Sequence, residues 1–126
     1  MQVLIRKTVM DSILSYAKMC HPKEGILLLR GKAKGDVIRV EEVLIPPLSI
    51  RGNGFSSFPP HMLPLDFSII GVAHSHPSGI LSPSTADLNN FYGKIMIIVA
   101  HPYMGEKNMV VIDGKGKKLK YRIVED

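Results

Sequence analysis

Apolar residues occur along the chain in short groups whose spacing predicts strands and helices in turn. Residues 3–6 have the composition of a short strand, with three apolar residues before Arg6. The apolar residues that follow recur at helical spacing: Val9, Ile13, Tyr16, Ala17 and Cys20. Thr8 and Asp11 form a helix-opening pair, and His21-Pro22 ends the pattern. We therefore expect a short strand followed by a helix with one face on a sheet.

Two further strands are predicted after this helix. Residues 24–30 are an almost unbroken apolar run bounded by Gly31, which is typical of a strand covered on both faces. Residues 36–45 form a second strand, connected to the first through residues 31–35. The first part of the chain thus predicts the order strand, helix, strand, strand.

A stretch rich in glycine and proline, residues 48–66, follows these strands. Its composition disfavours regular structure, and it is not apolar enough to be buried. Long loops inside compact domains are often functional lids or binding segments. A surface excursion with a few residues packed down explains the composition equally well. We expect a long loop and leave both interpretations open.

The second half of the chain predicts four more strands and one helix. Residues 67–73 are apolar and partly β-branched, and a helix opened by Pro83 is expected over residues 83–92. The remaining strands are expected at residues 95–101, 109–113 and 119–124. In the last of them apolar residues alternate with Lys and Arg, as in an edge strand protected by its charges. The prediction is an α/β fold, with a mixed, curved sheet of about seven strands flanked by helices, in a single domain over residues 1–126.

The composition narrows the class of protein without deciding its function. Sixteen Lys and Arg against eleven Asp and Glu give a net charge of +5, which favours an acidic partner, either protein or nucleic acid. No apolar run approaches the roughly 20 residues of a membrane span, and the N-terminus lacks a signal-peptide core. We therefore expect a soluble, cytoplasmic protein that does not bind membranes. Its single cysteine, Cys20, is expected to be a buried or half-buried thiol, and a homodimer bridged through it stays open.

Residues 74–87 contain the main candidate for chemistry. His74 and His76 lie one residue apart at the end of a predicted strand, so their side chains face the same way. Asp87 falls in the first turns of the next helix, which brings a carboxylate back toward them. Two imidazoles and one carboxylate are three of the four ligands of a tetrahedral zinc ion, with water in the fourth position. Paired histidines at a strand end are, by themselves, more often a polar surface feature, and it is Ser84 and Asp87 that favour the metal site.

Hydrolysis of a peptide or isopeptide bond at zinc also needs a group that takes a proton from water and passes it to the leaving amine. Glu24 is the candidate, because it precedes a buried strand that is expected to run beside the strand of His74. A solvated charge at a strand end is the alternative for Glu24. Ser84 could donate a hydrogen bond to the oxyanion, although Ser84-x-x-Asp87 is also a helix-capping pattern.

These residues together resemble the JAMM (MPN-plus) zinc metalloproteases, and the small archaeal, deubiquitinase-like (desampylase) members most closely. The motif is His74-Ser-His76-Pro, six residues, Ser84, two residues and Asp87, preceded by Glu24-Gly-Ile-Leu-Leu-Leu. The resemblance covers nearly the whole chain and implies the family's β-α-β sandwich, similar to cytidine deaminases. It implies one Zn²⁺ per chain with a bound water, held by His74, His76 and Asp87. Glu24 would be the general acid/base, and Ser84 would assist the oxyanion.

The resemblance also implies an activity and a partner. The family cleaves peptide or isopeptide bonds after the C-terminal Gly-Gly of ubiquitin or ubiquitin-like modifiers, which in archaea are small sampylating (SAMP-type) proteins. Its first insertion, matching residues 48–66, closes over the modifier's tail as a β-segment. The second insertion is short here, residues 103–108, so selectivity among ubiquitin-chain linkages is not expected.

Two other functions compete with this one. The first is a peptidase that trims a C-terminal residue or adduct from a ubiquitin-like sulfur-carrier protein, which relatives perform with the same five residues. The second is a basic nucleic-acid-binding module with a structural zinc. RNA-binding sheets need exposed aromatic residues, and the lysine-rich last strand offers only Tyr121, which makes nucleic acid the less favoured partner.

Overall fold

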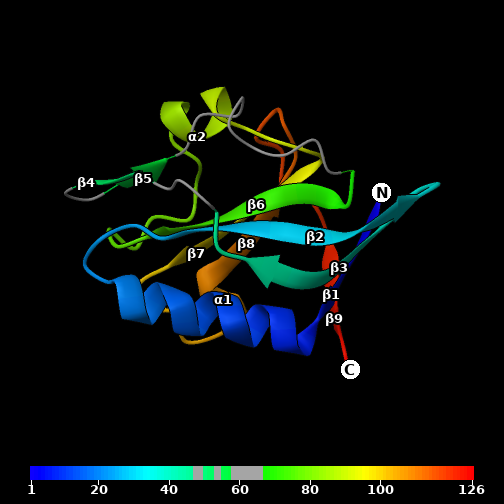
Figure 1. Ribbon diagram of the computed structural model, residues 1–126, viewed down its shortest axis with the longest axis horizontal. Coiled ribbons are helices and arrows are strands. Elements are labelled where there is room, and N and C mark those ends of the chain that lie inside the picture. The colour runs from blue at the N-terminus through cyan, green and yellow to red at the C-terminus, as the bar shows by residue number, and fades with distance from the viewer. Residues whose placement is uncertain (47–49, 53–54, 58–66) are drawn as a thin grey trace.

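Figure 1 shows the computed structural model of the protein, which describes residues 1–46, 50–52, 55–57 and 67–126. Its elements in chain order are β1 (Gln2–Arg6), α1 (Lys7–Cys20), β2 (Ile26–Lys34), β3 (Val37–Leu44), β4 (Ile50–Gly52), β5 (Phe55–Ser57), β6 (Ile69–His76), α2 (Thr85–Asn89), β7 (Ile95–Ala100), the 3₁₀ helix η2 (Glu106–Asn108), β8 (Met109–Ile112) and β9 (Tyr121–Val124). One sheet has seven strands in the order β8-β7-β6-β2-β3-β1-β9, and β4 and β5 form a second, two-stranded sheet. The predicted α/β fold with a mixed sheet of about seven strands is confirmed.

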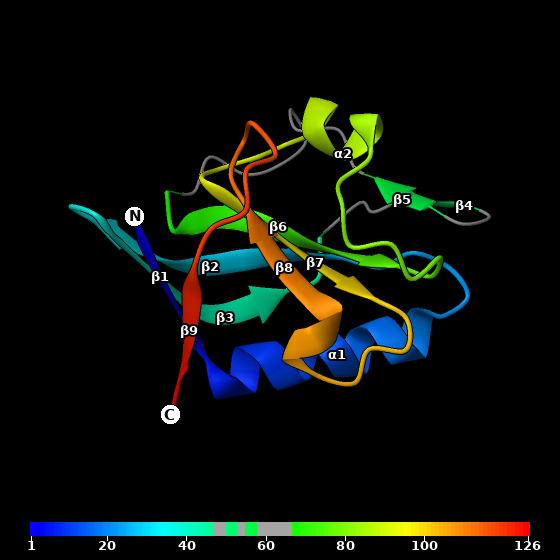
Figure 2. The same ribbon diagram turned by 180° about the vertical axis from the view of Figure 1, so that it is seen from behind.

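The two faces of the large sheet are covered by different helices. Figures 1 and 2 show α1 along one face and α2 over the other. The core cluster on the α1 side contains Ile13 and Ala17 of that helix together with Leu27 and Leu29 of β2. Ile26 and Leu28 of β2 belong to the second cluster, on the α2 side. The first half of β2 is therefore buried on both faces, as its apolar run predicts.

β6 lies in the middle of the sheet, between β2 and β7, and all eight of its residues are buried. It runs antiparallel to β2 and parallel to β7. A Cβ atom on Gly71 would lie 2.1 Å from the carbonyl oxygen of Ile95, so this close pairing requires glycine. The chain thereby fixes the C-terminal end of β6, with its two histidines, within paired strands on both sides.

The start of α1 differs from the sequence prediction. The helix begins at Lys7, directly after β1, and its N-cap is Arg6, which makes no side-chain capping hydrogen bond. Thr8 and Asp11 are therefore not a capping pair. Because no residue separates β1 from α1, Thr8 already lies inside the first turn, and Asp11 pairs with the Lys7 ammonium at 2.9 Å.

Two other boundaries move by several residues. β2 continues to Lys34 and β3 begins at Val37. The turn between them is therefore two residues long instead of spanning residues 31–35. Gly35 adopts a φ of +58° there, which suits a tight hairpin. The helix predicted over residues 83–92 is the shorter α2, Thr85–Asn89, and its N-cap is Ser84, so Pro83 precedes the helix instead of opening it.

The glycine- and proline-rich stretch of residues 48–66 is described only in part. It contains β4 and β5, paired antiparallel with Gly52 opposite Phe55, so it is not wholly irregular as its composition suggests. The rest of this predicted loop lies outside the described residues. No helix in the described part of the chain is long and apolar enough to cross a membrane.

Candidate metal centre

The two histidines of the motif lie at the end of β6 and face the α2 side of the sheet. They are 5 % and 8 % exposed, so neither is a surface feature. Ser75, between them, faces the opposite way because side chains alternate along a strand. Its hydroxyl accepts a hydrogen bond of 2.7 Å from the backbone N–H of Gly25. This bond fastens the segment that precedes β2 to the end of β6.

Glu24 lies directly across from His76. β2 and β6 are paired with Ile26 opposite His74, and the Ser75 N–H donates to the Gly25 carbonyl, so the same register continues to Glu24. The Glu24 Oε1 atom is 4.0 Å from the His76 Nε2 atom. Pairing of two strands that are distant in the sequence thus brings the carboxylate to the histidines, as predicted from the apolar run after Glu24.

Asp87 is placed by the start of α2. Ser84 and Asp87 form a capping box, in which the Ser84 hydroxyl accepts from the Asp87 N–H at 3.0 Å and the Asp87 Oδ2 atom accepts from the Ser84 N–H at 2.9 Å. The same Oδ2 atom lies 3.0 Å from the His76 Nε2 atom. Ser84 is therefore a helix cap, as the capping pattern predicted, and the cap orients a buried carboxylate toward the histidines.

The contacts of His76 indicate that a cation belongs beside it. Its Nδ1 atom lies 2.8 Å from the Ile80 carbonyl oxygen, which can only accept a hydrogen bond, so Nδ1 carries a proton. In a neutral imidazole Nε2 then presents a lone pair to the carboxylates of Asp87 and Glu24. Such a contact is repulsive unless a second proton or a metal ion lies between the groups.

Burial and charge shift the acidities of all four groups. Burial raises the pKa of Glu24 to about 7 and lowers that of His74 to about 4. Burial alone would also lower the pKa of His76, but hydrogen bonds to Asp87 and Ile80 and the carboxylate charges leave it above its usual value. For Asp87 burial acts upward, yet hydrogen bonds from His76 and Ser84 and the nearby histidines lower the pKa to about 2.

These residues fit a zinc ion. The His74 Nδ1 atom is buried without a hydrogen-bond partner among the described residues and lies 3.8 Å from Asp87 Oδ1. The two histidine–aspartate separations, 3.0 and 3.8 Å, bracket the roughly 3.3 Å between two ligands of a tetrahedral zinc at bond lengths of about 2.0–2.1 Å. Imidazole nitrogens with a carboxylate suit zinc better than the oxygen-preferring Mg²⁺ or Ca²⁺.

The potential ligand atoms that lie closest together are not those of the three predicted ligands, because Glu24 stands in the place of His74. Among the described residues, the ligand atoms of Glu24, His76 and Asp87 lie within 4.8 Å of one another. His74 joins this group through Asp87 only. The structure thus brings together all five predicted site residues, and the division between ligand and base stays a prediction.

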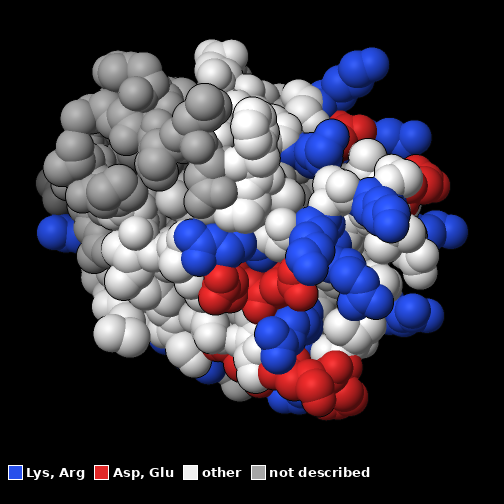
Figure 3. Space-filling model, turned by 45° about the vertical axis from the view of Figure 1, so that its right-hand side comes forward, with Lys and Arg blue, Asp and Glu red and all other residues white. Residues whose placement is uncertain are grey.

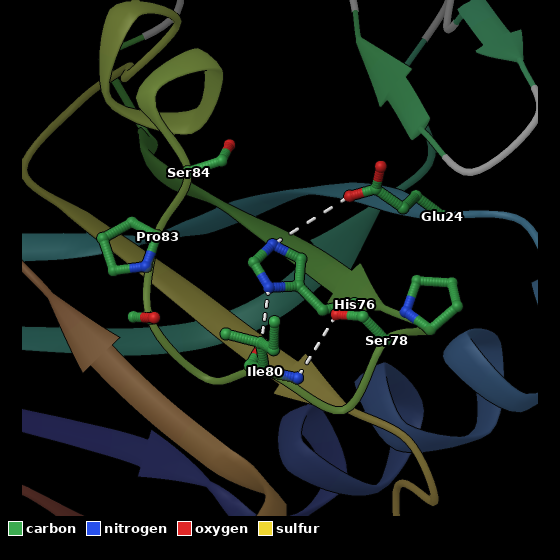
Figure 4. Close-up of a pocket in the computed structure, with 8 residues that line it drawn as sticks. Glu24, His76, Ser78, Ile80, Pro83 and Ser84 are labelled. Carbon is green, nitrogen blue, oxygen red and sulfur yellow. Dashed lines mark hydrogen bonds and ion pairs between the residues drawn. The ribbon is translucent and has the colours of Figure 1, made fainter.

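An open cavity of about 450 Å³ adjoins these groups. Figure 4 shows Glu24, His76 and Ser84 around it, with Ser78 and Ile80 in the loop that follows β6. The cavity gives a substrate access to one side of an otherwise buried cluster.

Two supporting groups escaped the sequence analysis. The Ser75 hydroxyl and the Ile80 carbonyl hold the Glu24 segment and the His76 ring, respectively. Ser75 could have been found from its position between the two histidines, where strand alternation points its side chain to the opposite face. The Ile80 group is a backbone carbonyl, which every residue has, so the sequence could not have indicated its role.

Comparisons with known proteins agree with this geometry. A family model described as "Prokaryotic homologs of the JAB domain" matches residues 6–116. A probable metalloprotease from Haloferax volcanii is 33 % identical over 120 residues, which cover 90 % of this chain and 74 % of the relative.

Solved structures give the same result. A JAB1/MPN domain protein from Archaeoglobus fulgidus has 32 % identity and a TM-score of 0.70, covering 96 % of this chain and 98 % of that one. A structure reported as "JAMM: A Metalloprotease-like Zinc Site in the Proteasome and Signalosome" has 30 % identity and a TM-score of 0.69, covering 99 % and 100 %. Family model, relative and fold thus agree over nearly all of the sequence, and the chain belongs to the prokaryotic JAB-domain family.

Proposed function

We propose that this chain is a zinc-dependent peptidase that cleaves the isopeptide or peptide bond after the C-terminal Gly-Gly of a ubiquitin-like modifier. The observation that carries the proposal is the convergence of buried imidazole and carboxylate donors with Glu24, whose pKa of about 7 suits a proton shuttle, beside an open cavity. A structural zinc site would be closed and would need no such carboxylate.

His74, His76 and Asp87 would hold the ion. When bound, zinc supplies Lewis-acid chemistry, lowering the pKa of water and polarising a carbonyl. The Ile80 carbonyl keeps the proton of His76 on Nδ1 and so reserves Nε2 for the metal. The capping box holds Asp87 in the same way. The protein thus presents its ligands in a fixed arrangement before any metal arrives.

Glu24 would move the proton. Its carboxylate takes a proton from the attacking water and passes it to the leaving amine, a step that works best when the pKa is near the working pH. The Ser84 hydroxyl accepts from the Asp87 N–H, which leaves its own proton to donate toward the cavity that the residue lines. Capping and oxyanion stabilisation are therefore compatible roles for one hydroxyl.

The family relation and the shape of the site support the Gly-Gly substrate. The described strands β4 and β5 lie on the same side of the large sheet as α2 (Figures 1 and 2), which is the side that carries the cavity residues. A tail without side chains would be held by backbone hydrogen bonds to strand-like segments. The amides at residues 56 and 57 should then gain protection from hydrogen exchange when the modifier binds.

The test is to incubate the purified protein and Zn²⁺ with a modifier joined through its Gly-Gly tail to a lysine side chain. Release of the intact modifier, abolished by a chelator and by Glu24→Gln, is expected. Asp11→Asn, which removes an exposed carboxylate paired with Lys7 on α1, is the control and should be fully active. Cleavage that persists after Glu24→Gln, or that does not depend on metal, would contradict the proposal.

A further inference from the structure

Basic residues form an ordered array on the large sheet, at the end opposite the candidate metal centre. Lys32 of β2 is directly opposite Arg39 of β3, Arg39 is opposite Leu4 of β1, and Leu4 is opposite Arg122 of β9. Directly paired residues share one face, so three cations lie in a row across four strands. Lys34 lies two residues beyond Lys32 in β2, and Lys120 lies two residues before Arg122, just ahead of β9. Both extend the row. We call these five residues the cationic row: Lys32, Lys34, Arg39, Lys120 and Arg122.

The cationic row lies on the same face of the sheet as the candidate metal centre. Side chains alternate along β2, and Ile26 and Leu28 belong to the core on the α2 side, so Lys32 and Lys34 continue on that face. Glu24 is eight residues before Lys32, which corresponds to about 27 Å along the strand. Figure 1 shows β2 running from one end of the molecule to the other. One face thus carries the cavity at one end and a positive surface at the other.

Neither stability nor edge protection accounts for the whole cationic row. All five side chains are exposed, and within the described part of the chain none has an ion-pair partner. Like charges directly opposite each other, as Lys32 and Arg39 are, destabilise a sheet. Lysines guard exposed strand edges, which explains Lys120 and Arg122 at β9 and also Lys32 and Lys34, because the pairing of β2 with β6 stops at Arg30. Arg39 lies between β2 and β1, so no strand edge accounts for it or for its position directly opposite Lys32. The pairing of Arg39 with a like charge therefore points to a role of the row outside the fold.

The charge pattern points to an acidic protein as the partner. Figure 3 shows basic side chains gathered over this part of the surface with acidic ones beside them. Asp36 lies in the turn between β2 and β3, and Glu42 of β3 is directly opposite Arg30 of β2. Asp36 pairs with the N-terminus and Glu42 with Arg30. A continuous polyanion such as nucleic acid would be repelled by these carboxylates, whereas a protein can match both signs. The four strands offer no aromatic side chain for base stacking on this face, because Tyr121 packs against the α1-side core.

We propose that the cationic row is a docking surface for the acidic folded body of the protein substrate whose tail enters the cavity. This inference rests on the proposed function, since it takes the partner to be the substrate. A folded modifier of about 80 residues has a radius of gyration of about 12 Å and so is about 30 Å across, which is enough to contact both ends of this face. Docking there would speed encounter and orient the tail without touching the reacting bond.

The test uses Lys32→Gln/Arg39→Gln in the zinc-loaded protein. The matched control, Lys7→Gln/Lys18→Gln, removes two exposed charges from α1 on the other face. The probe is a fluorescent acidic ubiquitin-like protein ending in Gly-Gly. The row variant should weaken its binding roughly tenfold at low ionic strength, the control should not, and about 1 M salt should erase the difference. Removing the opposed charges should leave the melting temperature equal or higher, so lost binding will not reflect lost folding.

A second substrate separates the two proposals. A short isopeptide that carries only the Gly-Gly tail reaches the cavity but not the row, so the row variant should cleave it at the wild-type rate while kcat/KM for the full conjugate falls roughly tenfold. If wild type cleaves neither substrate but the row variant still binds the acidic protein more weakly, the proposed function fails and the docking surface stands. Equal binding by row variant and control would overturn the docking surface. Weakened binding of duplex nucleic acid with unchanged binding of the acidic protein would also overturn it.

Discussion

The affinity for zinc should fall steeply below pH 7, because the ion has to displace protons from two groups. In the metal-free protein, pKa values of about 2 for Asp87 and about 4 for His74 leave both without a proton near pH 6. Burial raises the pKa of Glu24 to about 7, and the bonds to Asp87 and Ile80 and the nearby carboxylates raise the pKa of His76 above its usual value, which favours the protonated form of both groups there. A cation bound beside them therefore releases two protons.

The slope of affinity against pH counts these protons. Each displaced proton lowers the apparent affinity about tenfold per pH unit, or about 1.4 kcal/mol. Wild type should approach a loss of roughly 100-fold per unit, about 2.7 kcal/mol, well below both pKa values. Glu24→Gln retains only the His76 proton and should lose about tenfold per unit. Both slopes should flatten as the pH rises through the raised pKa values.

Competition with a chromophoric chelator measures the slope, and calorimetry in two buffers of different ionisation enthalpy counts the released protons directly. The exposed Glu42→Gln should behave like wild type. Equal slopes for wild type and Glu24→Gln, or an affinity independent of pH, would refute the placement of Glu24 beside the ion. At about pH 8 Glu24→Gln should bind zinc within a few-fold of wild type if Glu24 is the base; a loss of roughly 100-fold would make it a ligand.

Three further predictions concern the fold around the ion. Alanine at His76 or Asp87 should abolish stoichiometric zinc binding in equilibrium dialysis while circular dichroism still shows a folded chain. Ser84→Ala should lower turnover roughly 10²-fold and the free energy of unfolding by about 1 kcal/mol. Ser84→Gly should lower turnover equally but cost only a few tenths of a kcal/mol of stability. Normal turnover in both variants would mean that Ser84 acts only as a helix cap. Gly25→Ala places a Cβ 3.0 Å from both Cys20 Sγ and Tyr16 Cε2, so it should reduce turnover with zinc retained. Adding Cys20→Ala removes one of the two close contacts and should partly restore turnover.

Most of the strands and the main site elements were predictable because the relevant signals are local. The apolar run after Glu24 and the alternation in the last strand each reflect burial on known faces, and β2 and β9 follow them. The histidine pair was predictable for the same reason, since alternation alone places His74 and His76 on one face. Burial of both histidines could not be read from the motif, because it depends on β2, β7 and α2 closing around the end of β6.

The errors occurred where the deciding interaction was not local. Thr8 and Asp11 have the spacing of a capping pair, but β1 leads into α1 without a gap, and the position of β1 is set by its parallel pairing with β3 and β9. Pro83 suits a first helical position, yet the reciprocal bonds between Ser84 and Asp87 start α2 two residues later. In each case a tertiary or reciprocal contact outweighed a single-residue preference.

The two interpretations of Ser84-x-x-Asp87, helix cap and active site, describe the same bonds. The capping box holds Asp87 Oδ2 toward His76, and Ile80 holds the far side of the His76 ring. The Ser84 N–H and the Ile80 carbonyl are backbone groups, and they make these bonds whether or not a metal is present. Structural zinc domains, in contrast, unfold when the metal is removed because their ligands have no other support. Here the sheet and the cap supply that support, so a chelator should remove activity and leave the fold intact, as expected of a site in which zinc serves chemistry.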